Sequence, residues 1–100
     1  MNIATSIEGP LAIFAPQGSL TVQNSPALKG IIDSTPASIC DFVIDLEDVT
    51  YISSAGLRVF EATDKLARRR GGTLRLVHPA RSVRELFDMI GLANEITVEG

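Results

Sequence analysis

The sequence predicts an α/β fold built on a central sheet that is mixed but mostly parallel. Apolar runs typical of strands alternate with stretches whose apolar residues recur at helical spacing, in the order β-β-α-β-α-β-α-β. Strand-helix-strand alternation makes the later strands parallel to one another. The first two strands follow each other directly, so we expect them to form an antiparallel N-terminal β-hairpin at the edge, with the helices packed on the sheet.

Size and composition exclude several classes of protein. The chain has 100 residues, 45% of them hydrophobic, which suits one packed domain that we expect to span residues 1–100. It contains no apolar run long enough for a membrane span, and its start lacks the order of a signal peptide, so a cytoplasmic protein without direct membrane insertion is expected. The formal net charge of −3 argues against binding to nucleic acid.

The sequence has a single cysteine, Cys40, and a single histidine, His78. One cysteine excludes an internal disulfide, and the two residues together supply too few ligands for a structural zinc site. We therefore expect no metal and no cofactor. Cys40 stands at the start of an apolar run and is expected to be a small buried hydrophobe. A catalytic Cys–His pair would need these two side chains to meet, and nothing in the sequence indicates that they do.

The first half of the chain gives two strands and a helix. Residues 3–8 and 11–14 have strand character and are separated by a Gly-Pro turn, and a loop at 18–21 follows. A serine-proline pair at 25–26 indicates a helix start, because a hydroxyl caps the free N–H groups and proline suits the first helical position. The next proline stops this helix by about Thr35.

A central strand and a long helix follow. The nearly continuous apolar run at 42–46, interrupted only by Asp45, predicts a strand covered on both faces. Apolar residues at helical spacing over 57–70 predict the second helix. Three arginines at 68–70 stand before two glycines at 71–72. We expect the arginines to complement the negative end of the helix dipole, and a partner-binding patch is a second use compatible with the first.

The C-terminal part of the chain predicts a strand, a helix and a last short strand. Alternating residues at 73–77 indicate the strand. Ser82, followed three residues later by Glu85, has the spacing of a capping box at the start of a helix whose apolar face covers 83–90. The glycine after this helix suits its C-terminal cap, and residues 96–98 form the last strand.

The stretch VIDLEDVTYISSAGLRVF contains the most informative feature, a pair of serines between the central strand and the second helix. Ser53, Ser54 and Gly56 lie at this joint. Three interpretations are open. A hydroxyl there can cap the helix by accepting a hydrogen bond from a free N–H group. It can instead be a nucleophile, or an acceptor for a phosphoryl group.

A nucleophilic serine needs a general base and a group to orient it. His78 follows the strand 73–77, which ends on the same side of a parallel sheet as the strand 42–46, so His78 could approach the serines. No acid is evidently placed to orient it. A phosphate, by contrast, is tolerated at a helix N-terminus, because the dipole and free N–H groups favour an anion. A partner packed on the small residues there would then meet added bulk and about two unmatched charges.

The segment with the serines resembles the core motif of STAS domains, the family of anti-sigma-factor antagonists. Asp45-Leu46, Tyr51-Ile52 and Ser-Ser-Ala-Gly-Leu at 53–57 match that motif in order. The loop at 18–21 is similar to the family's loop before the first helix, and residues 82–98 are similar to its closing helix and strand. The resemblance covers nearly the whole chain and implies the STAS fold, whose order of elements agrees with the predicted one.

The resemblance also implies a function. Such proteins are not enzymes but bind an anti-sigma factor that is also a serine kinase, and so free a sigma factor. The kinase phosphorylates the antagonist and releases it, and a PP2C-type phosphatase restores it. Ser54 falls on the phosphoacceptor position, with Ser53 as the alternative, and a monomer or weak dimer is expected. The resemblance implies that the partner contacts Thr21, Ser53, Ser54, Ala55, Gly56, Leu57 and Arg58.

Two departures from the family pattern concern the acceptor. Ser53 and Thr21 each stand where an acid is frequent, so the region carries less negative charge, and the second hydroxyl leaves the acceptor ambiguous. Two other functions stay open. One is a constitutive STAS subunit of a lipid-transport ABC complex, or of a stressosome-type scaffold, without a phosphorylation switch. The other is a small hydrolase that uses Ser54 with His78.

Overall fold

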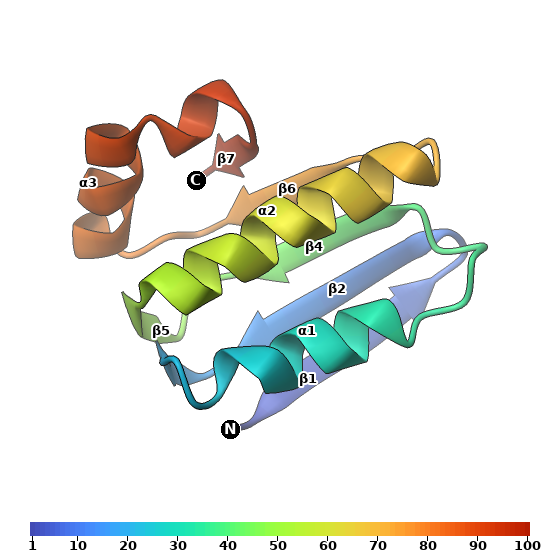
Figure 1. The fold of residues 1–100 in the computed structure, drawn as a ribbon, viewed down its shortest axis with the longest axis horizontal. Coiled ribbons are helices and arrows are strands. Elements are labelled where there is room, and N and C mark those ends of the chain that lie inside the picture. The colour runs from blue at the N-terminus through green and yellow to red at the C-terminus, as the bar shows by residue number, and fades with distance from the viewer.

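In the computed structural model, which describes all 100 residues, helices lie across one face of a five-stranded sheet (Figure 1). Apolar side chains of the strands and of all three α-helices form the core, and the four phenylalanines are fully buried in it. The elements in chain order are β1 (Ile3–Glu8), β2 (Leu11–Pro16), β3 (Gly18–Leu20), α1 (Ser25–Asp33), β4 (Asp41–Asp45), β5 (Val49–Ile52), α2 (Ser54–Arg69), β6 (Leu74–Val77), α3 (Arg81–Ile90), the short 3₁₀ helix η1 (Leu92–Asn94) and β7 (Thr97–Glu99).

The central sheet confirms the predicted α/β fold. Its strand order is β1-β2-β4-β6-β7. The first pair is antiparallel and every other pair is parallel, as expected for an N-terminal hairpin followed by strand-helix-strand units. Helices α1 and α2 lie side by side on one face, and α3 lies beyond the end of β6 (Figure 1). In the register of the middle pair, Asp45 is opposite Val77, so the residue after β6 emerges beside the end of β4.

A second, two-stranded parallel sheet was not expected from the sequence. It joins β3 to β5, where the sequence predicted a loop at 18–21 and no strand between the run at 42–46 and the serines. The loop prediction is wrong and β5 was missed, because strands of three and four residues are too short to show a period of two, and each is recognisable only from its pairing with the other. The buried side chains of Leu20 and Ile52 hold the pair against the core. This pairing brings the loop at 18–21 next to the segment that carries the serines, and both segments resemble the family's motifs.

The first helix is capped one residue earlier than predicted. Asn24, not Ser25, is the N-cap residue, and the helix ends at Asp33 with Ser34 as its C-cap, in agreement with a stop by about Thr35. Ser25 is buried inside the first turn, where its hydroxyl donates to the carbonyl of Thr21 at 2.5 Å. The proline at the helix start is confirmed. A hydroxyl before proline therefore serves here to tie the helix to the preceding loop.

The predicted capping box of the last helix is wrong, whereas its predicted glycine end is confirmed. Ala80 is the N-cap of α3 and offers no side-chain hydrogen bond, so Ser82 lies inside the helix. The side chain of Glu85 lies 3.4 Å from that of Arg81, one turn earlier. Gly91 has φ 71°, the left-handed conformation that glycine adopts without steric cost.

The three arginines at the end of α2 do more than complement its dipole. Arg68 pairs with Asp64 at 3.0 Å. Arg70 reaches across to the loop between α1 and β4, where its guanidinium donates four hydrogen bonds of 3.0 to 3.2 Å. Their acceptors are the Thr35 hydroxyl and the carbonyls of Thr35, Pro36 and Ile39. The same group lies 5.9 Å from the centre of the Phe42 ring.

We expect Arg70→Ala to lower the free energy of unfolding by about 2 kcal/mol, because it leaves the partly buried carbonyls of Thr35 and Ile39 without their charged donor. Arg70→Lys should recover only part of the loss, since an ammonium group lacks the planar fork that reaches several acceptors. Urea unfolding followed by circular dichroism measures both changes. Arg69→Ala is the matched control, because Arg69 makes no hydrogen bond or ion pair, and a similar loss in that variant would contradict the assignment.

Candidate functional site

The two serines at the start of α2 have different environments. Ser53 is only 7% exposed and has extended backbone angles. Its hydroxyl accepts a hydrogen bond from the N–H of Gly56 at 3.2 Å, and its own N–H donates to the carbonyl of Leu20 at 2.8 Å. Ser54 is the first residue of the helix, is exposed, and makes no side-chain hydrogen bond. The cap interpretation is therefore confirmed for Ser53, and the hydroxyl of Ser54 is left free.

This difference predicts unequal effects of removing the two hydroxyls. We expect Ser53→Ala to lower the free energy of unfolding by about 1 kcal/mol, since it removes a helix cap. Ser54→Ala should change it by less than about 0.5 kcal/mol, as is usual for an exposed substitution that breaks no hydrogen bond. Urea denaturation of the two variants side by side measures the difference. Equal losses would mean that both hydroxyls support the helix.

Gly56 allows α2 to lie very close to the small sheet. A Cβ atom on this residue would lie 2.9 Å from Cγ2 of Ile52 and 3.1 Å from Cβ of Leu20. Contacts at those distances require the neighbours to move, and both neighbours are buried. The glycine in the motif is thus explained by close packing, which fixes the first turn of α2 against β3 and β5.

The loop after β3 is held in one conformation by reciprocal hydrogen bonds. The N–H of Thr21 donates to the Asn24 side-chain oxygen at 2.7 Å, and the N–H of Asn24 donates to the Thr21 hydroxyl at 3.1 Å. The Asn24 amide group also donates to the carbonyl of Ser19 at 2.7 Å. Because β3 pairs with β5, this loop lies next to the serines. The structure therefore brings Thr21 into the same region as the other expected site residues.

A groove of about 330 Å³ runs between the first turns of α1 and α2. Its walls are mostly apolar, and it is lined by Ser25, Pro26, Lys29, Ala55, Arg58, Val59 and Ala62. Two of the expected site residues, Ala55 and Arg58, belong to it. Leu57, a third, is half-buried and packs against the core instead.

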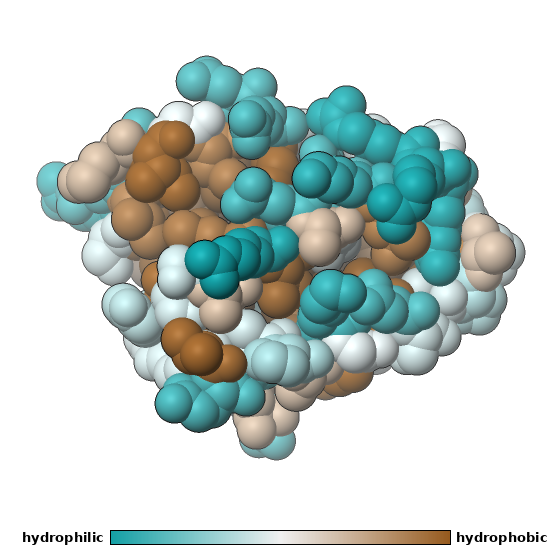
Figure 2. Space-filling model, viewed as in Figure 1, coloured by the Kyte–Doolittle hydropathy of each residue, from teal (hydrophilic) through white to brown (hydrophobic).

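Hydrophobic surface gathers near this end of the molecule. On the face that carries α1 and α2, Figure 2 shows an apolar area beside the first turns of α2, extending toward α3. Several large apolar side chains are well exposed, among them Val22 after β3, Tyr51 just before the serines, and Met89 and Ile90 at the end of α3. Exposed apolar area of this kind is typical of a protein-docking surface.

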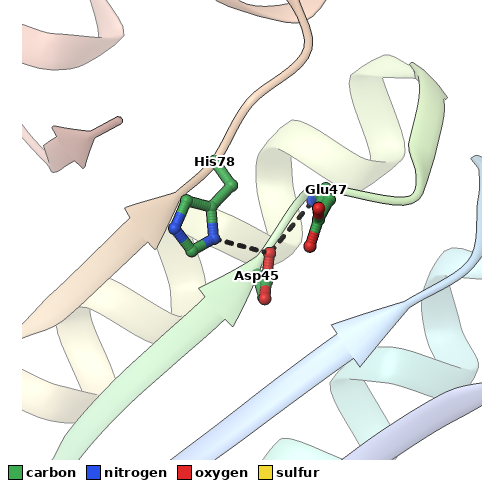
Figure 3. Close-up of side chains that lie close together, drawn as sticks. All are labelled: Asp45, Glu47 and His78. Carbon is green, nitrogen blue, oxygen red and sulfur yellow. Dashed lines mark hydrogen bonds and ion pairs between the residues drawn. The ribbon is translucent and has the colours of Figure 1, made fainter.

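His78 lies beside Asp45 and Glu47, at the carboxyl ends of β4 and β6 (Figure 3). Its Nδ1 is 3.2 Å from Oδ1 of Asp45, and the same oxygen accepts a hydrogen bond from the N–H of Glu47 at 3.0 Å. An acid beside this histidine was not predicted from the sequence, because the contact depends on the register between β4 and β6. No hydrogen bond joins His78 to Ser53 or Ser54, so the serine–histidine pair that a hydrolase needs is not formed.

The same three side chains form the one group that could together hold a metal ion. Two carboxylates and an imidazole offer ligand atoms within 4.8 Å of one another. Glu47 and His78 are exposed, and exposed groups of this kind are common on proteins that bind no metal.

Cys40 lies away from this group of three side chains. It precedes β4 at the opposite end of the strand from Asp45, which rules out a catalytic Cys–His pair, and it is half-buried rather than buried as expected.

No helix of the structure is both long and apolar enough to cross a membrane.

Comparison with known proteins identifies the family. The sequence model of the STAS domain matches residues 2–100. The chain is 33% identical over 81 residues to the anti-sigma-B factor antagonist of Bacillus subtilis, an overlap that covers 81% of this chain and 74% of that protein.

Three solved structures share the fold. The protein TM1081 of Thermotoga maritima has a TM-score of 0.89 at 21% identity, covering 98% of this chain and 86% of that one. The phosphorylated form of the Bacillus cell fate determinant SpoIIAA has a TM-score of 0.78 at 13% identity, covering 97% and 90%. A sulfate transporter family protein from Wolinella succinogenes has a TM-score of 0.80 at 16% identity, covering 94% and 80%. With the sequence match over almost the whole chain, these findings establish that the protein belongs to the STAS domain family.

Proposed function

We propose that the protein is an anti-sigma factor antagonist that is switched by phosphorylation of Ser54. In its unmodified form it binds an anti-sigma factor that is also a serine kinase, and a sigma factor is released. The kinase then transfers a phosphoryl group to Ser54, the complex separates, and a PP2C-type phosphatase restores the antagonist. The protein acts in the cytoplasm as a monomer or weak dimer, by binding rather than by catalysis.

The observation that carries this proposal is the unequal environment of the two serines. Ser54 is exposed and its hydroxyl is uncommitted, whereas Ser53 is buried and already caps the helix. A kinase needs an acceptor hydroxyl that it can reach, and Ser54 offers one without loss of the cap. The sequence relationship to an anti-sigma-B factor antagonist supports the same role.

The electrostatics of the helix start favour a phosphate at this position. The first turn of α2 contains no acidic residue, and the positive end of the helix dipole points at Ser54. A phosphate there adds about 1.5 to 2 negative charges without disturbing a buried contact. The surface changes far more than the fold does. A partner that had packed on the small residues at 54–56 would meet a bulky anion instead.

The test is mass spectrometry of the protein purified from its native host, with peptide mapping over residues 47–68. One phosphate on Ser54 in part of the population, together with a serine kinase that copurifies with the unmodified form, is the expected result. A phosphate on Ser53 would retain the switch but move the acceptor. An unmodified chain under both growth and stress conditions would contradict the switch and favour a constitutive docking subunit of a transport complex or scaffold.

A further inference from the structure

The groove between α1 and α2 carries positive charge and no negative charge. Two of its lining residues are charged, Lys29 and Arg58, and both are cations. The ammonium group of Lys29 is held by Asp33, one turn further along α1, at 2.5 Å. Arg58 is exposed and makes neither a hydrogen bond nor an ion pair. The groove therefore has one uncommitted guanidinium group on an otherwise apolar wall.

Arg58 is also the free cation nearest to Ser54 along the helix. The two residues are four positions apart on α2, so their side chains are neighbours on one face. The other cations of α2 that have no ion pair, Lys65 and Arg69, lie about 16 Å or more from Ser54 along the helix axis. Among the cations of α2 without an ion pair, Arg58 is thus the one that a negative group attached to Ser54 could reach.

We propose that Arg58 couples the modification of Ser54 to occupation of the groove. In the unmodified protein, the guanidinium pairs with an acidic side chain of a partner segment whose apolar residues lie between α1 and α2. After phosphorylation, the same guanidinium pairs with the phosphate on Ser54 and leaves the groove. The inference rests on the proposed function and adds the chemistry of the docking segment and the residue that senses the phosphate.

The chemistry of arginine and the shape of the groove support this coupling. A guanidinium group can form two parallel hydrogen bonds with either a carboxylate or a phosphate. The phosphate on Ser54 carries more charge than the partner's carboxylate and belongs to the same molecule as Arg58, so it should compete successfully for the guanidinium group. The lining residues from α2 other than Arg58 are all apolar, and two are alanines, which leaves space for an apolar side chain of the partner. Charge complementarity then selects a segment with an acidic residue at the position of Arg58.

Two measurements test the proposal, and the first needs no partner. Phosphoserine is incorporated at position 54 during synthesis, and the phosphate is titrated by ³¹P NMR at low ionic strength. Because a nearby cation stabilises the dianion, we expect Arg58→Ala to raise the second pKa of the phosphate by about 0.2 to 0.4 units, and Arg58→Lys to restore part of the shift. Lys65→Ala, the control, should leave this pKa unchanged. Equal pKa values in the wild-type and Arg58→Ala proteins would overturn the proposal.

The second measurement is the affinity of the unmodified protein for the serine kinase that copurifies with it. We expect Arg58→Ala to weaken binding about 5- to 30-fold and Arg58→Glu to weaken it further, with Lys65→Ala equal to wild type. Wild-type affinity in Arg58→Glu would overturn the proposal and leave the phosphorylation switch intact. Failure of the proposed function is recognised separately, by the absence of phosphate on Ser54 in the native protein. The ³¹P comparison tests the pairing of Arg58 with the phosphate whether or not the native protein is phosphorylated.

Discussion

Replacing Ser54 with aspartate should leave the protein folded and weaken its binding to the partner kinase about 10- to 100-fold. The fold should survive because Ser54 is exposed and its hydroxyl has no partner, and because a carboxylate is favourable at the start of a helix. Binding should fail because an unmatched charge in a close interface costs several kcal/mol. Titration calorimetry with the kinase and a thermal unfolding curve measure the two effects separately.

Ser54→Ala is the counterpart of that experiment. It should bind the kinase as the wild type does, but ATP should no longer release it, because the acceptor hydroxyl is absent. Phosphoserine at position 54 should have a larger effect than aspartate, since it carries nearly twice the charge and more bulk. Binding of wild-type strength by both the aspartate and the phosphoserine variants would refute the switch. Release of the Ser54→Ala protein by ATP would instead move the acceptor to another residue.

The parts of the fold that could be predicted are those with long local patterns. The apolar run of β4 and the helical spacing of α2 each extend over several residues, and they determine a mostly parallel sheet covered by helices. The turn between β1 and β2 was equally clear from its glycine and proline. The pairing of β3 with β5 was not predictable, because a three-residue strand has no pattern of its own. That pairing nevertheless brings the two loops of the site together.

The identity of the exposed serine could not be predicted for a different reason. Ser53 and Ser54 are adjacent hydroxyls at a helix boundary, and a shift of that boundary by one residue exchanges their roles. Burial and the hydrogen bond from Gly56 decide in favour of Ser53 as the cap. The absence of an ion pair at Arg58 could not be predicted either, since it depends on which carboxylates lie near the guanidinium group in space. Sequence reasoning therefore pointed to the joint before α2, but it left open which of the two serines is the cap and which is exposed.

Gly72→Ala should cause the largest loss of stability of any substitution considered, about 3 kcal/mol or more. A Cβ atom on Gly72 would lie 1.9 Å from the carbonyl oxygen of Cys40 and 2.8 Å from Oδ1 of Asp41. The carbonyl belongs to the backbone at the start of β4 and cannot turn aside. Relief would require separating the end of α2 from the sheet, which would break the 3.1 Å hydrogen bond from the N–H of Thr73 to Asp41.

Gly30→Ala is the matched control for this prediction. Gly30 lies inside α1, and a Cβ atom there would have no neighbour within 4 Å, so the same substitution should raise the free energy of unfolding by about 0.5 to 1 kcal/mol. Urea unfolding should thus give changes of opposite sign in the two variants, and a Gly72→Ala midpoint at or above that of wild type would contradict the argument. Ser54 is the first residue of α2, and Gly72 lies just beyond its other end, which is Arg69. If the folded fraction of Gly72→Ala still binds the kinase with wild-type affinity, the docking surface depends only on the first turns of the helix, where Gly56 fixes it against β3 and β5.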